Sequence, residues 1–64
     1  MQKRTLYVDE REVSKITQRA LSTLRNDRHR RRGIPYHKIG RSVRYNLEDV
    51  IDYMESRKIQ TEVF

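Results

Sequence analysis

The tightest constraint on the fold is the segment Gly33-Ile34-Pro35, which holds the only proline and one of the two glycines in a chain of 64 residues. Glycine and proline both stop helices, because glycine has excess backbone freedom and proline lacks the amide hydrogen and clashes with the preceding turn. A helix that approaches this segment from the N-terminal side therefore cannot extend far past Arg32.

A first short helix is predicted near the N-terminus. Asp9 can cap it, with Glu12 three positions further on and acidic side chains near the positive end of the helix dipole. Val13 and Ile16 lie on one face at helical spacing. The pattern predicts a helix over residues 9–16.

A second helix is predicted after a polar break at residues 17–19. Apolar spacing returns at Ala20, Leu21 and Leu24, which predicts a helix over residues 20–28. Two short helices joined by about three residues are the outline of a helix-turn-helix.

A β-hairpin is predicted beyond the helix-stopping segment. Residues 36–39 and 43–46 contain aromatic and β-branched side chains, and they flank a three-residue loop, 40–42, that contains glycine. This composition is typical of two antiparallel strands joined by a short turn.

The last predicted element is a helix over residues 47–57. Asn46 can cap it, acids follow in its first turn, and basic residues come at its C-terminal end. Its apolar stripe consists of Leu47, Val50, Ile51 and Met54. We expect this stripe to hold together one domain over residues 7–58, with flexible segments at 1–6 and 59–64.

Positive charge is concentrated in the middle of the chain. Residues 15–44 hold ten of the 15 lysines and arginines but only one of the nine acids, which gives this segment a net charge of +9. The other residues carry −3, and the total is +6. Eleven of the basic residues are arginine, which suits bidentate contacts with phosphate and guanine. The pattern indicates a polyanionic partner.

Other classes of function find little support in the sequence. The chain has no cysteine, and its two histidines, His29 and His37, give no reason to expect a metal. The acids cluster at predicted helix starts, where capping accounts for them, and no catalytic set or glycine-rich phosphate loop is visible. We expect neither enzyme activity nor a cofactor. With no secretory signal and no apolar segment that could span a membrane, we expect a cytoplasmic protein.

The segment from Arg31 to Val50 resembles the small excisionase and AlpA-like DNA-binding proteins, which are related to the DNA-binding domain of MerR-type regulators. The residues that match the recurring family pattern are Gly33, Pro35, Lys38, Ile39, Gly40, Arg41, Val43, Arg44 and Tyr45. The similarity covers about Tyr7 to Ser56 and implies a winged helix-turn-helix, mainly α-helical with a small β-hairpin. The family often has glycine at the position of Gln18, where a left-handed backbone costs more, and serine or threonine at the position of Ala20.

The resemblance implies that the second helix enters the major groove of duplex DNA. The outward side chains of that helix are Ser22, Thr23, Arg25, Asn26 and Arg28. Serine and threonine suit phosphates or either base edge, asparagine suits adenine, and arginine suits guanine. Our candidates for reading bases are therefore Ser22, Arg25 and Asn26.

Phosphate contacts are expected on both sides of the second helix and at the hairpin. Arg19 lies in the turn, and the basic run after the helix consists of Arg30, Arg31 and Arg32. Such residues supply affinity without sequence information. By the resemblance, the hairpin is a wing on the adjacent backbone or minor groove, and its candidate contacts are Lys38, Arg41, Ser42 and Arg44.

Three tyrosines resemble the aromatic platform on which single-stranded nucleic acids stack. Tyr36, Tyr45 and Tyr53 alternate with apolar residues, however, so we expect them in the core or at its rim.

Other partners remain open at this point. Arginine-rich segments also bind structured RNA, so the chain could be an RNA-binding module. It could instead be an adaptor whose acidic ends or tail recruit a recombinase such as an integrase, which is compatible with DNA binding. With no coiled coil after the last helix, we expect further copies to bind cooperatively along nucleoid DNA rather than a stable dimer. The target sequence, and the choice between excisionase, repressor and activator, are not specified by the sequence.

Overall fold

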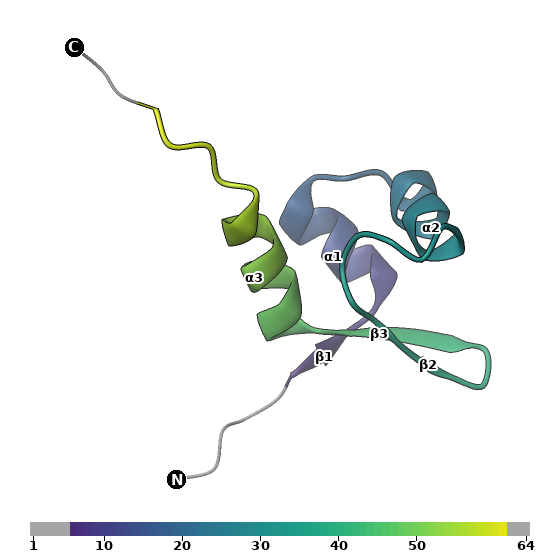
Figure 1. The fold of residues 1–64 in the computed structure, drawn as a ribbon. Helices are drawn as coiled ribbons and strands as arrows, with labels where there is room; N and C mark the ends of the chain where they lie inside the picture. Colours follow the sequence, from purple (N-terminus) through teal and green to yellow (C-terminus); the bar gives the residue numbers. More distant parts are fainter. Residues whose placement is uncertain (1–5, 62–64) are drawn as a thin grey trace, which may run out of the picture.

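The computed structural model describes residues 6–61, and this part of the chain forms three α-helices and three short β-strands (Figure 1). In chain order they are β1 (Tyr7–Val8), α1 (Glu10–Thr17), α2 (Leu21–His29), β2 (His37–Ile39), β3 (Ser42–Asn46) and α3 (Leu47–Ser56). The predicted order of helix, turn, helix, hairpin and helix is confirmed, and the fold is a winged helix-turn-helix.

Helix α1 begins and ends with local backbone signals. The Asp9 carboxylate accepts a hydrogen bond of 2.9 Å from the backbone N–H of Glu12, which is the predicted cap. The helix ends because Gln18 adopts a left-handed backbone, with φ 59° and ψ 27°. The Gln18 side-chain amide donates back to the carbonyl of Lys15 at 3.2 Å. The left-handed position that glycine often fills in the resembling family is therefore occupied here by glutamine.

Helix α2 starts without a side-chain cap of its own, because Ala20 stands at the N-cap position. Hydroxyl groups of α1 hold the connecting turn instead. The Ser14 hydroxyl donates to the Arg19 carbonyl at 2.6 Å, and the Thr17 hydroxyl accepts from the Arg19 N–H at 3.3 Å. The two helices of the motif are thus joined by bonds to the backbone of one turn residue.

Helix α2 ends earlier than the glycine and proline require. Arg31 has a left-handed backbone with φ 55°, and its N–H bonds to the Arg28 carbonyl, while the Arg32 N–H bonds to the Asp27 carbonyl. These two bonds around a left-handed residue form a Schellman motif. The sequence predicted an end near Arg28, with Gly33 and Pro35 as the outer limit, and the observed end is His29; Gly33, with φ 88°, lies beyond the end of the helix.

The three strands form an antiparallel sheet in the order β1-β3-β2. The predicted hairpin is β2 and β3, and β1 is an addition that two residues were too few to signal. The Leu6 carbonyl accepts a 2.8 Å hydrogen bond from the Leu47 N–H, so Leu6 is tied to the start of α3 although we expected residues 1–6 to be flexible. The rest of that segment and residues 62–64 lie outside the described residues.

Each helix and the strand β3 supply a buried apolar side chain, and the loop before β2 supplies another. The buried apolar residues are Val13, Leu24, Ile34, Tyr45 and Val50. Tyr53 packs against this cluster, and the Tyr36 ring, although more exposed, lies 6.2 Å from the ring of Tyr45. This agrees with the prediction that the tyrosines belong to the core or its rim.

Two predicted apolar stripes are only partly buried. On α1 the inward residues are Val13 and Thr17, one turn apart, and Ile16 is 43% exposed. On α3 the inward residue is Val50, whereas Ile51 and Met54 are 48% and 41% exposed. The reason is geometric: α1 and β3 pack against one side of α3, and no other helix or strand of residues 6–61 covers the far part of its stripe. Within the described residues, no helix is long and apolar enough to cross a membrane.

Candidate nucleic-acid interface

A groove of about 350 Å³ separates the N-terminal part of α1 and helix α2 from the β2–β3 hairpin. Its lining residues are Asp9, Glu10, Arg11, Arg25, Arg28, Arg41, Ser42, Val43 and Arg44. Five of these are arginines and two are acids. The fold therefore brings predicted residues of the second helix and of the wing to the two sides of one basic groove.

The centre of the groove is an ionic network around Glu10. The Arg25 guanidinium donates from Nε to both carboxylate oxygens, at 3.2 Å each, and from Nη2 to Oε2 at 2.6 Å. Arg28 Nη2 donates to the other oxygen, Oε1, at 2.9 Å. The hydrogen bond from Arg25 is the main cause that lowers the pKa of Glu10 from 4.5 to about 2, with Arg28 adding to it against the opposing effect of burial.

Arg28 bonds to residues of the protein itself through both of its terminal nitrogens. Its Nη1 donates a 2.7 Å hydrogen bond to the hydroxyl of the buried Tyr45, and its guanidinium lies 5.8 Å from the centre of the Tyr36 ring. With only 15% of the side chain exposed, Arg28 links α2 to α1 and to β3. Its predicted contact with DNA stays a prediction, and these partners indicate a structural role.

The outward face of α2 is defined by four exposed positions at helical spacing. These positions are Ser22, Arg25, Asn26 and His29, which follow i, i+3, i+4 and i+7. The three candidates for reading bases therefore lie on one solvent-facing surface. Thr23 is half-buried and lies at the edge of that surface.

Two of the predicted phosphate contacts meet on a different part of the molecule. Arg19 Nη2 lies 3.0 Å from Asp27 Oδ2, and Arg32 Nε lies 3.4 Å from Asp27 Oδ1. Together with Tyr53 and Arg57 they line a separate pocket of about 250 Å³. Arg19 and Arg32 thus share a carboxylate that fixes the loop after α2 to the turn before it.

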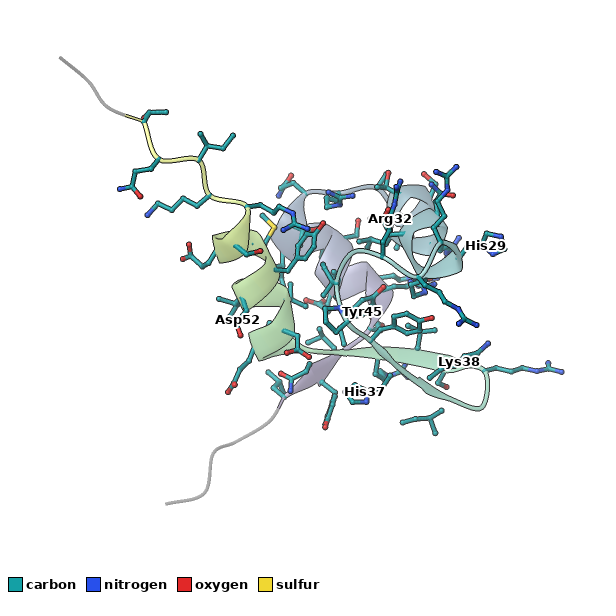
Figure 2. All side chains as sticks on the ribbon, viewed as in Figure 1. His29, Arg32, His37, Lys38, Tyr45 and Asp52 are labelled. Carbon is teal, nitrogen blue, oxygen red and sulfur yellow. The ribbon has the colours of Figure 1, made fainter. Side chains whose placement is uncertain are left out.

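Asp27 also explains why residue 33 is a glycine. A Cβ atom at Gly33 would lie 3.0 Å from the Asp27 side chain, and the backbone there has φ 88°, so both the limited space and the backbone conformation favour glycine. Arg30 and Arg31, in the same connection, are exposed. In Figure 2, Arg32 lies on the side of α2 nearer to α1, whereas His29 lies on the far side of α2.

The hairpin carries its charges on two faces. Lys38 pairs with Val43 across the strands, and His37 pairs with Arg44. Because residues opposite one another share a face, Lys38 lies on the face that Val43 turns toward the core, while Arg44 lies on the other face. Arg44 Nη1 donates to the Val43 carbonyl at 2.8 Å, and the labelled His37 and Lys38 mark the two sides in Figure 2.

Sequence reasoning missed four of the nine residues that line the groove: Asp9, Glu10, Arg11 and Val43. Glu10 was one of several acids that helix capping explained, and its partner Arg25 lies 15 positions away in the chain. Only the crossing of α1 and α2 brings them together, and a single sequence carries no signal of that crossing. Among the described residues, no group of three or more His, Cys, Asp or Glu side chains is placed to hold a metal ion.

Comparison with protein families places the chain in a known family. Residues 7–58 match a family of helix-turn-helix domains, and the chain belongs to that family. The family includes AlpA-like and excisionase-like DNA-binding proteins. No curated protein and no solved structure matches the chain. A helix-turn-helix domain indicates DNA binding, with duplex DNA as the partner.

Proposed function

We propose that this protein binds double-stranded DNA in a sequence-specific manner, as an excisionase or as a regulator of phage or mobile-element genes. In this proposal α2 enters the major groove, and the β2–β3 hairpin lies as a wing on the adjacent backbone or minor groove. The observation that carries the proposal is the groove between α2 and the hairpin, which has five arginines in its walls. We also propose that the protein works in the cytoplasm on the nucleoid, without enzyme activity.

The exposed face of α2 suits base reading. Ser22, Arg25 and Asn26 present a hydroxyl, a guanidinium and an amide on one surface, and these groups distinguish base edges in the major groove. The opposite face of α2 holds the buried Leu24 and is attached to the core. A helix anchored in this way can present three polar side chains in a fixed arrangement.

Phosphate contacts would come from both flanks of that face. On the wing, Arg41 and Ser42 lie at the tip of the hairpin, facing the groove, and both are exposed. At the other flank, Arg30 and Arg31 follow the end of α2. Contacts on two sides of the base-reading helix would fix its orientation on the duplex.

The proposal is tested by selecting a preferred duplex from random DNA and then titrating that duplex and a scrambled one. We expect Asn26→Ala to weaken binding to the selected duplex only, and Arg30→Gln to weaken binding to both. RNA of the same length serves as a competitor. Equal losses on both duplexes for Asn26→Ala, or RNA that competes as well as the selected duplex, would contradict the proposal.

A second role as an adaptor for a recombinase is favoured by the exposed side of α3. Ile51 and Met54 leave apolar surface uncovered on a helix that does not line the basic groove. We expect the double variant Ile51→Gln with Met54→Gln to keep its affinity for DNA and to lose assembly with a recombinase of the integrase type, or with further copies on DNA. Unchanged assembly would remove this candidate.

A further inference from the structure

We propose that Glu10 is a positioning residue for base recognition. Its carboxylate holds one edge of the Arg25 guanidinium and leaves the other edge for a guanine, so that Glu10 helps to set sequence specificity without touching DNA itself. This inference rests on the proposed placement of α2 in the major groove.

The bonding pattern of Arg25 divides its guanidinium into a used and an unused edge. Glu10 accepts hydrogen bonds from Nε and from Nη2, which form the side edge of the planar fork. The end edge, formed by Nη1 and the second hydrogen of Nη2, points away from the carboxylate. An arginine end edge matches the O6 and N7 acceptors of guanine in a bidentate arrangement. The Arg25 side chain is 57% exposed, so DNA can reach that edge.

Glu10 is itself held in place by a second arginine. Arg28 donates to Glu10 Oε1 at 2.9 Å and also to the hydroxyl of the buried Tyr45 at 2.7 Å. The chain of contacts therefore runs from the core, through Arg28 and Glu10, to Arg25. An arginine that is already oriented loses less conformational freedom on binding, which favours the base that fits its fixed edge over other bases.

The charge of Glu10 separates this role from a simple electrostatic effect. A negative charge in a basic groove weakens attraction to phosphates, so removing it should strengthen binding to every DNA sequence. A positioning role makes a separate prediction: removing the carboxylate should lower the preference of the protein for the selected duplex over the scrambled one. The low pKa of Glu10, about 2, keeps the carboxylate ionised in any buffer near neutral pH, and so the contact with Arg25 persists throughout the measurement.

Glu12 provides the matched control. It lies on the same helix, its side chain is exposed, and its nearest basic partner is Lys15 at 3.7 Å. Glu12→Gln removes the same charge from α1 but leaves Arg25 untouched. We expect it to strengthen binding to the selected and the scrambled duplex by the same factor, and to leave their ratio unchanged.

The experiment measures Kd for the selected duplex, for the scrambled duplex, and for a duplex with one base pair changed at the position where Arg25→Ala loses its preference. We expect Glu10→Gln to bind the scrambled duplex at least as well as the unmodified chain does. We expect it to lose about tenfold in preference at that one base pair. In the double variant with Arg25→Ala, Glu10→Gln should cause no further loss of preference.

Glu10→Asp keeps the experiment decisive if Glu10→Gln does not fold. The shorter side chain keeps the charge but moves the carboxylate back from Arg25, so affinity for scrambled DNA should stay constant while the preference falls. An unchanged preference in the folded variants, or an equal loss at every base pair, would overturn the positioning role while leaving the proposed function intact. An unmodified chain without preference for any duplex would overturn the proposed function, and this inference with it.

Discussion

Arginines that are close in the sequence have different roles because their guanidinium groups meet different partners. Arg25 and Arg28 share Glu10, yet Arg25 is largely exposed and Arg28 is largely buried against Tyr45. Arg30, two residues after Arg28, is exposed. The sequence predicted that all three contact DNA, with Arg25 as a candidate for reading bases and Arg30 as a phosphate contact. It could not single out Arg28, because its partners are on α1 and β3.

The role of Arg28 predicts a loss of stability on its removal. We expect Arg28→Ala to lower the free energy of unfolding by about 1–3 kcal/mol, because it leaves the buried Tyr45 hydroxyl and the Glu10 carboxylate short of a partner. Arg30→Ala, at an exposed position, should change it by less than about 0.5 kcal/mol. Urea denaturation followed by circular dichroism measures both. Equal effects of the two substitutions would show that Arg28 is not part of the structural framework.

The Glu10 carboxylate predicts how stability depends on acid. Its pKa is about 2 in the folded chain against an ordinary 4.5, so the folded state binds its proton less readily than the unfolded state does. The stabilisation that follows is fully present above pH 4.5 and is lost as the pH falls toward 2. We expect the stability difference between the unmodified chain and Glu10→Gln to shrink across that range.

Urea midpoints at pH 6, 4 and 3 measure this difference. Glu12→Gln is again the control, since it removes an exposed carboxylate from the same helix. A difference between the unmodified chain and Glu10→Gln that stays constant from pH 6 to pH 3 would contradict the prediction.

At the scale of the elements, the sequence predicted where helices begin better than where they end. The residues with left-handed backbone conformations at the helix ends were only partly predictable. Asp9 and Asn46 are short polar side chains next to apolar helical patterns, and both accept the capping hydrogen bond that their sequence predicts. Arg31 ends α2 in a left-handed conformation that arginine does not signal. Strand β1 was missed because two residues cannot show alternation, and its pairing with β3 exists only in the folded chain.

The left-handed Gln18 predicts a stabilising substitution. Gln18→Gly should raise the free energy of unfolding by about 0.5–1 kcal/mol, because glycine avoids the strain of the left-handed backbone at a smaller cost in conformational entropy. Gln18→Ala should lower it, because alanine keeps the strain and loses the side-chain bond to Lys15. Thermal unfolding ranks the three proteins. A lower melting temperature for Gln18→Gly than for the unmodified chain would show that the side-chain bond outweighs the strain.

At the scale of the whole molecule, folding divides the basic segment between two surfaces. Arg25, Arg41 and Arg44 line the groove between α2 and the hairpin, whereas Arg19 and Arg32 share Asp27 on another part of the surface. The sequence placed the +9 segment on the helix-turn-helix and the wing, which the element order supports. It could not foresee that Asp27, the single acid in that segment, would engage two of the predicted phosphate contacts.

Because of this division, we expect the arginines of the basic run after α2 to contribute unequally to DNA affinity. The logarithm of the binding constant falls with the logarithm of salt concentration, with a slope of about −0.9 for each phosphate contact. Replacing the exposed Arg30 and Arg31 together by glutamine should therefore flatten the slope by roughly 1.8. Arg32→Gln should flatten it by less than one contact, because Asp27 already balances part of its charge.

Titrations of the selected and scrambled duplexes between about 50 and 200 mM salt provide the salt slope of each variant. The flattening should be the same on both duplexes, because phosphate contacts carry no sequence information. Thermal unfolding of each variant checks that the fold is kept, above all for Arg32→Gln, which loses its bond to Asp27. Unchanged slopes for the Arg30 and Arg31 double variant would remove the basic run from the interface and leave the groove between α2 and the hairpin as the binding surface.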